Sequence, residues 1–390
     1  MAGLQRSRLF WLITFLVPAI AVGLFWGLGF DGEITGFFRI GSEFPHSPYL
    51  NLNTARIVPG EVGHDGQQFL SIALDPGLQN PGTIEALDLP AYRYRRIFYP
   101  LLGYLLAFGQ RFLIPYTLVF LNYVAIVAIV LLGSAFLEHQ GNNPNHSLWL
   151  LGIPGFWISL SLGTAELVSS ALLLGSLYCY QQRRFTLTSI LLMGGCLTRE
   201  TLLIMGVAIG VTGLWERLKT KELLTLWSAG LPILLWSVYV EKALGSGLQQ
   251  AASNNLGFPL GGLLVKISTS ISLANFSIEK LYDLYNFSLI LLAFSLLLFI
   301  HWKTLGNNKI ISLCSAVLTT TFACLTPTVL GYYADYVRTF SDVYILLVLS
   351  TPLAFSLNQQ TPWMGWVYRG LVSFGLPIAS VGIWLSVSIP

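Results

Sequence analysis

Long apolar runs recur along almost the whole chain and constrain its fold more than any other feature of the sequence. A run of about 20 apolar residues can cross the hydrocarbon core of a bilayer as a helix. The candidate runs, some of them too short to span alone, are Leu9–Phe30, Ile97–Phe108, Pro115–Leu137, Leu148–Leu162, Leu167–Tyr180, Leu187–Leu214, Leu223–Val240, Phe287–Trp302, Ile310–Leu330, Val343–Phe355 and Trp366–Ile389. This pattern predicts an all-α polytopic membrane protein with about 10–11 transmembrane helices.

The composition supports the same class. Of 390 residues, 54% are hydrophobic and only 10% are charged, and the mean hydropathy is +0.67. Polar groups are therefore too few to cover a globular surface in water. The net charge of +3 is scattered, and no run of Lys and Arg suggests binding to nucleic acid. The four cysteines lie in apolar segments without metal-binding spacing, and we expect no metal and no other cofactor.

The polar connections set the expected organisation of the chain. Arg6 and Arg8 precede the first apolar run, which we interpret as a spanning helix rather than a cleaved signal peptide. The N-terminus is then cytoplasmic, and the first long connection, residues 31–96, lies on the outer face. A second long connection, residues 242–286, is expected to include another amphipathic helix. Without a flexible linker or an internal repeat, residues 1–390 are expected to form one integral membrane domain.

Two basic connectors bear on the direction of the later helices. Arg183-Arg184 and Arg217–Lys221 flank the apolar run Leu187–Leu214. If that run is one helix, the two connectors fall on opposite sides of the membrane. The positive-inside rule then leaves the parity of the crossings open.

Residues 31–96 form a polar island in this apolar chain. The island holds eight of the 18 acidic residues and six of the 18 prolines. From Asp65 onward, its apolar residues fit one face of a short amphipathic helix that ends at Asp75-Pro76 and lies along the membrane surface. If the protein performs chemistry, this island is where we expect it.

Asp65 has two interpretations at the start of that helix. Its carboxylate can act as a general base, because a sugar hydroxyl is too weak an acid to attack without one in hydrogen-bond reach. It can equally cap the helix, since Asp is a favoured N-cap residue. His64, Gln67 and Gln68 crowd the same turn, which is more polar functionality than a cap requires.

The segment Leu87–Pro100 leads from the island into the next apolar run. Its polar side chains of interest are Asp88, Tyr92, Arg93, Arg95 and Arg96. Guanidinium groups bind phosphate in bidentate fashion and stabilise the charge on a departing phosphate. Alternating Tyr and Arg are also typical of the water–lipid boundary, where rings and snorkelling cations lie. Asp88 can equally close a turn, because it lies near a proline.

Further charged residues lie within or beside apolar runs. These are Glu166, the adjacent pair Arg199 and Glu200, and Arg338 in the aromatic segment Tyr332–Asp342. Charges at membrane depth are costly, so they are expected to face a polar cavity or one another. Neighbours in sequence do not face each other on a helix, so Arg199 and Glu200 need partners elsewhere. Both interpretations remain open for these residues: contact with a substrate, or a structural ion pair between helices.

Taken together, these segments resemble a known group of proteins. Gly63–Pro76, Leu87–Pro100, Thr164–Glu166 and Leu197–Glu200 are similar to motifs of bacterial multi-pass proteins associated with cell-surface glycopolymer formation. That group resembles the GT-C glycosyltransferases, and the similarity covers roughly the first half of the chain. It implies a GT-C-like helical bundle with a large outer first loop that carries short amphipathic helices.

The resemblance also implies an activity. GT-C enzymes take a sugar from a polyprenyl-phosphate donor, usually with inversion, and here the acceptor would be a glycan or lipid of the cell envelope. Asp65 would be the base, the arginines of residues 93–96 would hold the lipid phosphate, and Glu166 and Arg199 would line the cavity. The enzyme would work on the outer, periplasmic face of the plasma membrane. His64 stands where the group often has an aromatic residue, and the absence of an Asp-x-Asp pair in the loop points to a metal-independent reaction.

Two other classes remain as alternatives. A transporter or flippase of a lipid-linked sugar would use Glu166 and Arg199 as a relay or gate and the island as a lid. A non-catalytic scaffold of a polysaccharide assembly complex would tolerate the loss of any single polar side chain. Asp65 distinguishes these classes, because only a transferase requires it for turnover.

Overall fold

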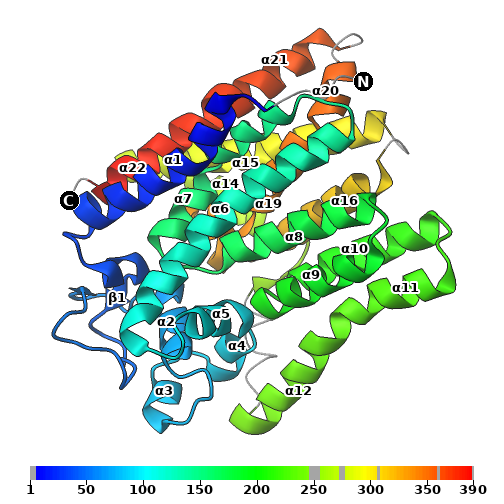
Figure 1. The fold of residues 1–390 in the computed structure, drawn as a ribbon. Helices are drawn as coiled ribbons and strands as arrows, with labels where there is room; N and C mark the ends of the chain where they lie inside the picture. Colours follow the sequence, from blue (N-terminus) through cyan, green and yellow to red (C-terminus); the bar gives the residue numbers. More distant parts are fainter. Residues whose placement is uncertain (1–5, 246–254, 272–276, 305–307, 358–360, 389–390) are drawn as a thin grey trace.

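The computed structural model describes residues 6–245, 255–271, 277–304, 308–357 and 361–388 as a bundle of helices (Figure 1). The first part of the chain contains α1 (Arg8–Leu24), η1 (Phe25–Gly29), η2 (Ile34–Phe38), β1 (Ile40–Gly41), β2 (Ile57–Val58), α2 (Asp65–Leu74), α3 (Pro81–Glu85), α4 (Pro90–Tyr94), α5 (Phe98–Leu106), η3 (Arg111–Leu113), α6 (Ile114–His139) and η4 (Pro144–Gly152). Next come α7 (Pro154–Ser161), α8 (Glu166–Gln181), α9 (Phe185–Thr198), α10 (Leu202–Trp215), α11 (Thr220–Trp227), η5 (Ser228–Gly230) and α12 (Leu231–Leu244). The last part contains α14 (Gly261–Ile271), α15 (Ile278–Lys303), α16 (Lys309–Ala323), α17 (Pro327–Leu330), α18 (Tyr333–Thr339), α19 (Ser341–Leu349), α20 (Thr351–Leu357), α21 (Pro362–Gly370), η6 (Leu371–Gly375) and α22 (Leu376–Ser388).

Five helices of the described residues are long and apolar enough to cross a membrane alone. They are Arg8–Gly29, Arg111–His139, Thr220–Leu244, Ile278–Lys303 and Pro362–Val387. Tyr333–Leu349 and Thr351–Leu357, bent by 52°, make a sixth if the pair is one span. The protein is therefore an all-α membrane protein. It has fewer full-length spans than the sequence predicted, because several apolar runs are divided into shorter helices.

The run Leu187–Leu214 is such a divided run, and our prediction about its flanking connectors was wrong. It folds as two short helices, α9 and α10, that are separated at Arg199–Thr201. Both helices contact α11, which follows the second connector. Arg183 and Glu216, on either side of the hairpin, form an ion pair of 2.8 Å. The two basic connectors therefore lie at the same end of the bundle.

Charge is distributed unequally between the two ends of the bundle. The polar island and the C-terminus lie at one end, and the N-terminus lies at the other (Figure 1). Within the described residues, the N-terminal end carries the bases Arg6, Arg8, Arg183, Arg184, Arg217, Lys219, Lys221, Lys303 and Lys309 and the acids Glu138, Glu216 and Glu222. Most of the acidic residues lie at the island end. The bundle is thus basic at one end and rich in carboxylates at the other.

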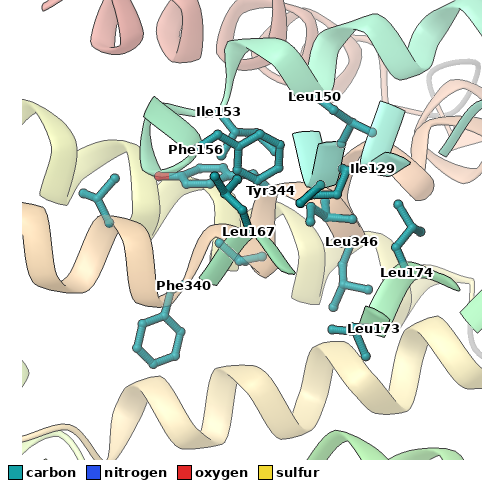
Figure 2. Packing of buried hydrophobic residues seen from close by; sticks show 14 of the residues in the cluster. Ile129, Leu150, Ile153, Phe156, Leu167, Leu173, Leu174, Phe340, Tyr344 and Leu346 are labelled. Atoms are coloured by element: carbon teal, nitrogen blue, oxygen red, sulfur yellow. The ribbon is translucent and has the colours of Figure 1, made fainter. Parts of the chain in front are cut away.

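The centre of the bundle is packed with large apolar side chains. Figure 2 shows this cluster, in which residues of η4, α7, α8 and α19 meet. Every residue of α19 is buried, and so is Trp157, whose indole N–H donates to the carbonyl oxygen of Leu151 at 3.1 Å. Contacts of this density hold helices together in lipid, where the hydrophobic effect between them is weak. The core fixes α8, α18 and α19 in one arrangement.

The polar island packs onto the bundle as a folded cap. A short parallel sheet joins β1 to β2, and α2 packs against α5 and η2. The sequence correctly predicted a helix from Asp65 to Leu74 that ends at Asp75. However, Gly66 to Leu74 are all buried, so protein encloses this helix and it does not lie free on the membrane surface.

In the second long connection, residues 242–286, the structure describes the helix α14 and the start of α15. Lys266 of α14 is buried, and its Nζ lies 2.6 Å from Asp283 Oδ2 on α15. The hydroxyl of Tyr336 on α18 donates to Asp283 Oδ1 at 3.0 Å. This contact connects the second long connection to α18. Sequence reasoning did not single out the Lys266–Asp283 pair.

Candidate active site

Asp65 begins α2 but does not cap it. His64 occupies the N-cap position, and no side chain there accepts a hydrogen bond from the first turn. The Asp65 carboxylate is instead bound by two arginines: Oδ1 lies 2.7 Å from Arg93 Nη1, and Oδ2 lies 2.5 Å from Arg338 Nη2. The capping interpretation is therefore wrong for Asp65. Its side chain belongs to a charged cluster.

Close packing of two glycines brings Asp65 and Arg338 together. A Cβ built on Gly66 would collide with the carbonyl oxygen of Leu162, so only glycine lets the start of α2 approach the end of α7. A Cβ built on Gly155 would lie 2.5 Å from the carbonyl oxygen of Val337, so glycine also lets α7 approach α18. These contacts place residues 273 positions apart in direct contact.

Arg338 is the centre of the cluster. Its side chain is only 6% exposed, yet three carboxylates surround it. Besides Asp65, Nη1 lies 2.7 Å from Glu166 Oε1 and Nη2 lies 3.0 Å from Asp335 Oδ1. Three acidic partners for one buried cation exceed what a single structural ion pair requires.

The three carboxylates share one position in their helices. Asp65, Glu166 and Asp335 each lie in the first turn of a helix, namely α2, α8 and α18. The N-terminus of a helix carries a partial positive charge that favours an anion. The convergence of these helix starts therefore helps to keep an excess of negative charge around Arg338.

Arg93 connects Asp65 to Asp88. Arg93 Nη2 lies 2.7 Å from Asp88 Oδ2, and Asp88 also accepts a hydrogen bond from the backbone N–H of Leu89. Asp88 thus does both things that the sequence allowed: it closes the turn before α4 and belongs to the cluster. The Asp75 carboxylate, by contrast, accepts from the backbone N–H groups of Gln79 and Asn80 and closes a turn.

Glu200 organises a second group of arginines. Its carboxylate accepts from Arg96 Nε at 2.8 Å and Nη2 at 2.7 Å, and Arg95 Nη2 lies 3.4 Å away. The Arg96 guanidinium lies over the Tyr92 ring, 4.4 Å from its centroid. Arg95 Nε is buried, and no described residue forms a hydrogen bond with it. Here cations exceed carboxylates, which is the opposite of the balance around Arg338.

Arg199 is buried beside both groups and is less completely paired. It is 5% exposed, and its Nη1 donates to the carbonyl oxygen of Thr339 at 3.4 Å. Its Nε has no hydrogen-bond partner within the described part of the chain. Arg199 and Glu200 do find their partners on other elements, as the sequence predicted.

The remaining predicted residues lie at the edge of the cluster. His64 Nε2 is 3.6 Å from Asp335 Oδ1, so this ring faces the same carboxylates. Gln67 is buried, and its side-chain oxygen accepts from the backbone N–H of Gly41 at 3.0 Å. Gln67 therefore ties α2 to β1.

Two acidic residues of the site were missed by sequence reasoning. Asp335 binds Arg338 three positions later on the same helix, a spacing that places two side chains on one face. Asp342 is buried, and its Oδ1 accepts from Ser170 Oγ at 2.5 Å. Their signal was present, because both flank Arg338 at the edge of an apolar run, where buried charges are expected to pair.

The electrostatic state of Asp65 follows from its surroundings. Burial opposes ionisation, but the guanidinium groups of Arg93 and Arg338 outweigh it and hold the pKa of Asp65 well below its ordinary value of 3.8. In the same way, burial disfavours the charge on Glu200, and Arg96 and Arg95 nevertheless lower its pKa. Both carboxylates are ionised at neutral pH.

The lowered pKa of Asp65 predicts how stability depends on pH. The ionised carboxylate contributes stability at pH values above its ordinary pKa of 3.8, and this contribution is lost as the pH falls below that value. We expect the wild type to lose more of its thermal stability between about pH 5 and about pH 3 than the variant Asp65→Asn loses. Melting of the two purified proteins across this range measures the difference. Equal losses of thermal stability in the two proteins would contradict a lowered pKa of Asp65.

Within the described residues, no group of three or more His, Cys, Asp or Glu side chains is placed to hold a metal ion. Comparisons of the chain with protein-family models, curated proteins and solved structures returned no match. The charged cluster itself is therefore the feature of this molecule that bears on its function.

Proposed function

We propose that this protein is a membrane glycosyltransferase that moves a sugar from a polyprenyl-phosphate donor to an acceptor of the cell envelope. The observation that carries the proposal is the position of Asp65, whose carboxylate lies between Arg93 and Arg338 in a buried charged cluster. Buried charges are costly even when they are paired, so the concentration of several of them at one place indicates a functional site. The resemblance of the surrounding motifs to GT-C enzymes agrees with this function.

The two halves of the cluster suit two parts of the reaction. Around Glu200, Arg95 and Arg96 supply an excess of positive charge, which favours the phosphate of the donor. Around Arg338, the carboxylates are in excess, which favours uptake of a proton from a hydroxyl group. The halves are close, because the guanidinium groups of Arg93, which pairs with Asp65, and of Arg96 both lie over the Tyr92 ring.

The proposed reaction is a single displacement at the anomeric carbon of the sugar. The acceptor oxygen forms a bond to the anomeric carbon of the sugar while the bond from that carbon to the phosphate oxygen breaks. The acceptor proton moves to Asp65, and the electron pair of the broken bond leaves with the polyprenyl phosphate. The arginines stabilise the charge that develops on that phosphate.

A carboxylate with a strongly lowered pKa is a weak base, so Asp65 requires activation before it can accept a proton. The donor itself can provide it. A phosphate that binds beside Arg96 attracts the neighbouring guanidinium of Arg93 away from Asp65 and weakens one of its two ion pairs. Loss of that cation raises the pKa of Asp65. In this mechanism, the base becomes competent only when the donor is bound.

The distribution of charge supports an orientation for the molecule. Basic residues concentrate at the cytoplasmic side of membrane proteins. The basic end that contains Arg183, Arg217 and Lys309 is then cytoplasmic, and the charged cluster lies toward the outer face of the plasma membrane. This orientation lets a lipid-linked donor enter sideways from the bilayer.

Binding of the donor tests the proposal. We expect the purified protein to bind a synthetic polyprenyl-phosphate sugar, and Arg95→Gln to weaken binding about 10- to 100-fold, because one charge-assisted hydrogen bond contributes roughly 1.5–3 kcal/mol. Glu200 keeps Arg96 as a partner in this variant, so the fold is retained. Arg111→Gln is the matched control, since Arg111 lies over the Tyr49 ring outside the cluster. If the wild type does not bind the donor, or if both variants lose equal affinity for it, the arginines beside Glu200 do not hold the donor phosphate.

A further inference from the structure

A cavity of about 560 Å³ opens at the end of the bundle opposite the charged cluster. Its walls come from the ends of α6 and α8, from the residue after α10, from the start of α16 and from the turn between α19 and α20. This volume lies within the range of small-molecule sites. No step of the proposed reaction uses this cavity.

The cavity carries a surplus of positive charge. Glu216 is neutralised by Arg183, 2.8 Å away, and its Oε2 also accepts from the hydroxyl of Tyr180 at 3.3 Å. Lys309 has its Nζ 5.2 Å from the centroid of the Trp215 ring. Among the residues that the structure describes, no carboxylate forms an ion pair with Lys309. This ammonium group is therefore available to an anion.

Backbone geometry adds to this preference. Lys309 and Ile310 begin α16, a helix of 15 residues, and both line the cavity. The backbone N–H of Ile311 donates to the Asn308 side chain at 3.4 Å. The N–H groups before it, at the start of the helix, have no partner inside the helix. The start of a helix favours an anion, most of all a phosphate.

Uncharged polar side chains also line the cavity. Gln181 Oε1 is buried without a hydrogen-bond partner among the residues that the structure describes, and Gln140 and Asn142 line the same cavity. An unpaired buried carbonyl oxygen costs free energy that a hydroxyl donor would recover. The cavity thus combines a site for an anion with acceptors and donors for hydroxyl groups.

We infer that this cavity is a second binding site, for a ligand that carries both a phosphate group and hydroxyl groups. Lys309 and the start of α16 hold the phosphate, and the amides of Gln140 and Gln181 bind the hydroxyls. Such chemistry occurs in soluble phosphorylated polyols and in the glycerophosphate headgroups of lipids. The inference is independent of the proposed function, because it uses no residue of the charged cluster.

Binding of two probes tests this inference and separates the two sources. Purified protein in detergent is titrated by calorimetry with glycerol 3-phosphate and, separately, with dioctanoyl phosphatidylglycerol. We expect at least one probe to bind the wild type and to bind Lys309→Gln about tenfold more weakly, the loss of one charge-assisted contact. Binding of the first probe indicates a soluble ligand, and binding of the second alone indicates a lipid headgroup.

Lys303→Gln is the matched control. Lys303 lies at the same end, with its Nζ 5.0 Å from the Trp302 ring centroid, but it does not line the cavity. A measurement on the wild type makes the test independent of how Lys309→Gln folds: the bound probe protects Lys309, and not Lys303, from acylation, as mass spectrometry detects. The inference is overturned if neither probe binds, or if both lysines react equally with the bound probe present.

Discussion

Replacement of Arg338 by methionine is expected to destabilise the protein more than any other substitution in the charged cluster. The side chain is only 6% exposed, and its loss leaves Asp65, Glu166 and Asp335 without their shared cation. Removal of one partner from a buried ion pair costs about 3–5 kcal/mol. Arg338→Met should therefore lower the melting temperature strongly and abolish sugar transfer. Thermal melting of the purified variant in detergent measures the effect.

The controls for Arg338 separate charge from geometry. Arg369→Met removes an exposed arginine that lies over the Phe355 ring, and it should melt close to the wild type. Arg338→Lys restores the charge but not the planar fork that contacts Glu166 and Asp65 through different nitrogens, so it should recover only part of the stability. If Arg338→Met melted like the wild type, the cluster would not be a coupled network of ion pairs.

Asp65→Asn is expected to have the largest effect on turnover without loss of the fold. General base catalysis contributes about 10²–10⁴-fold to a rate, and an amide cannot accept the proton. Arg93 keeps Asp88 and Arg338 keeps Glu166, so no buried cation loses all its partners. The variant should bind the polyprenyl-phosphate sugar and melt within a few degrees of the wild type. Rates of transfer by both proteins, at saturating donor, give the ratio.

A matched acid and a second variant make this result specific. Asp75→Asn removes another buried carboxylate of the island, one that closes a turn through Gln79 and Asn80, and it should change stability rather than the rate constant. A transporter would tolerate Asp65→Asn and fail with Glu166→Gln. Full activity of Asp65→Asn would therefore show that Asp65 is not the general base.

Much of the charged cluster was predictable from sequence. In so apolar a chain, each charged residue at membrane depth must find a polar neighbour. This argument selected Glu166 and Glu200 as residues that need a polar cavity or a charged partner, and the structure pairs each of them with an arginine. It did not give the pairing, because the partners of Arg338 come from α2 and α8, far away in sequence, and depend on close approaches at Gly66 and Gly155.

The topology was less predictable, for a physical reason. Hydropathy measures apolar length, and Leu187–Leu214 is apolar on both sides of Arg199 and Glu200. In the structure the helix breaks at Arg199–Thr201, and Glu200 pairs with Arg96, which is far away in sequence and gives no local signal of the turn. In the same way, α2 looks like a surface helix in sequence, and it is buried because it packs between the rest of the island and the helices α5 and α6.

Release of polyprenyl phosphate from a synthetic polyprenyl-phosphate sugar shows whether the protein transfers the sugar and whether Asp65 is needed for the transfer. Purified wild type and Asp65→Asn are each incubated with the donor and a cell-envelope glycan fraction, and the lipid products are separated and quantified. We expect free polyprenyl phosphate with the wild type, dependent on the glycan fraction, and an intact but bound donor with Asp65→Asn. An intact donor in both reactions, with binding retained by both proteins, would contradict a transferase.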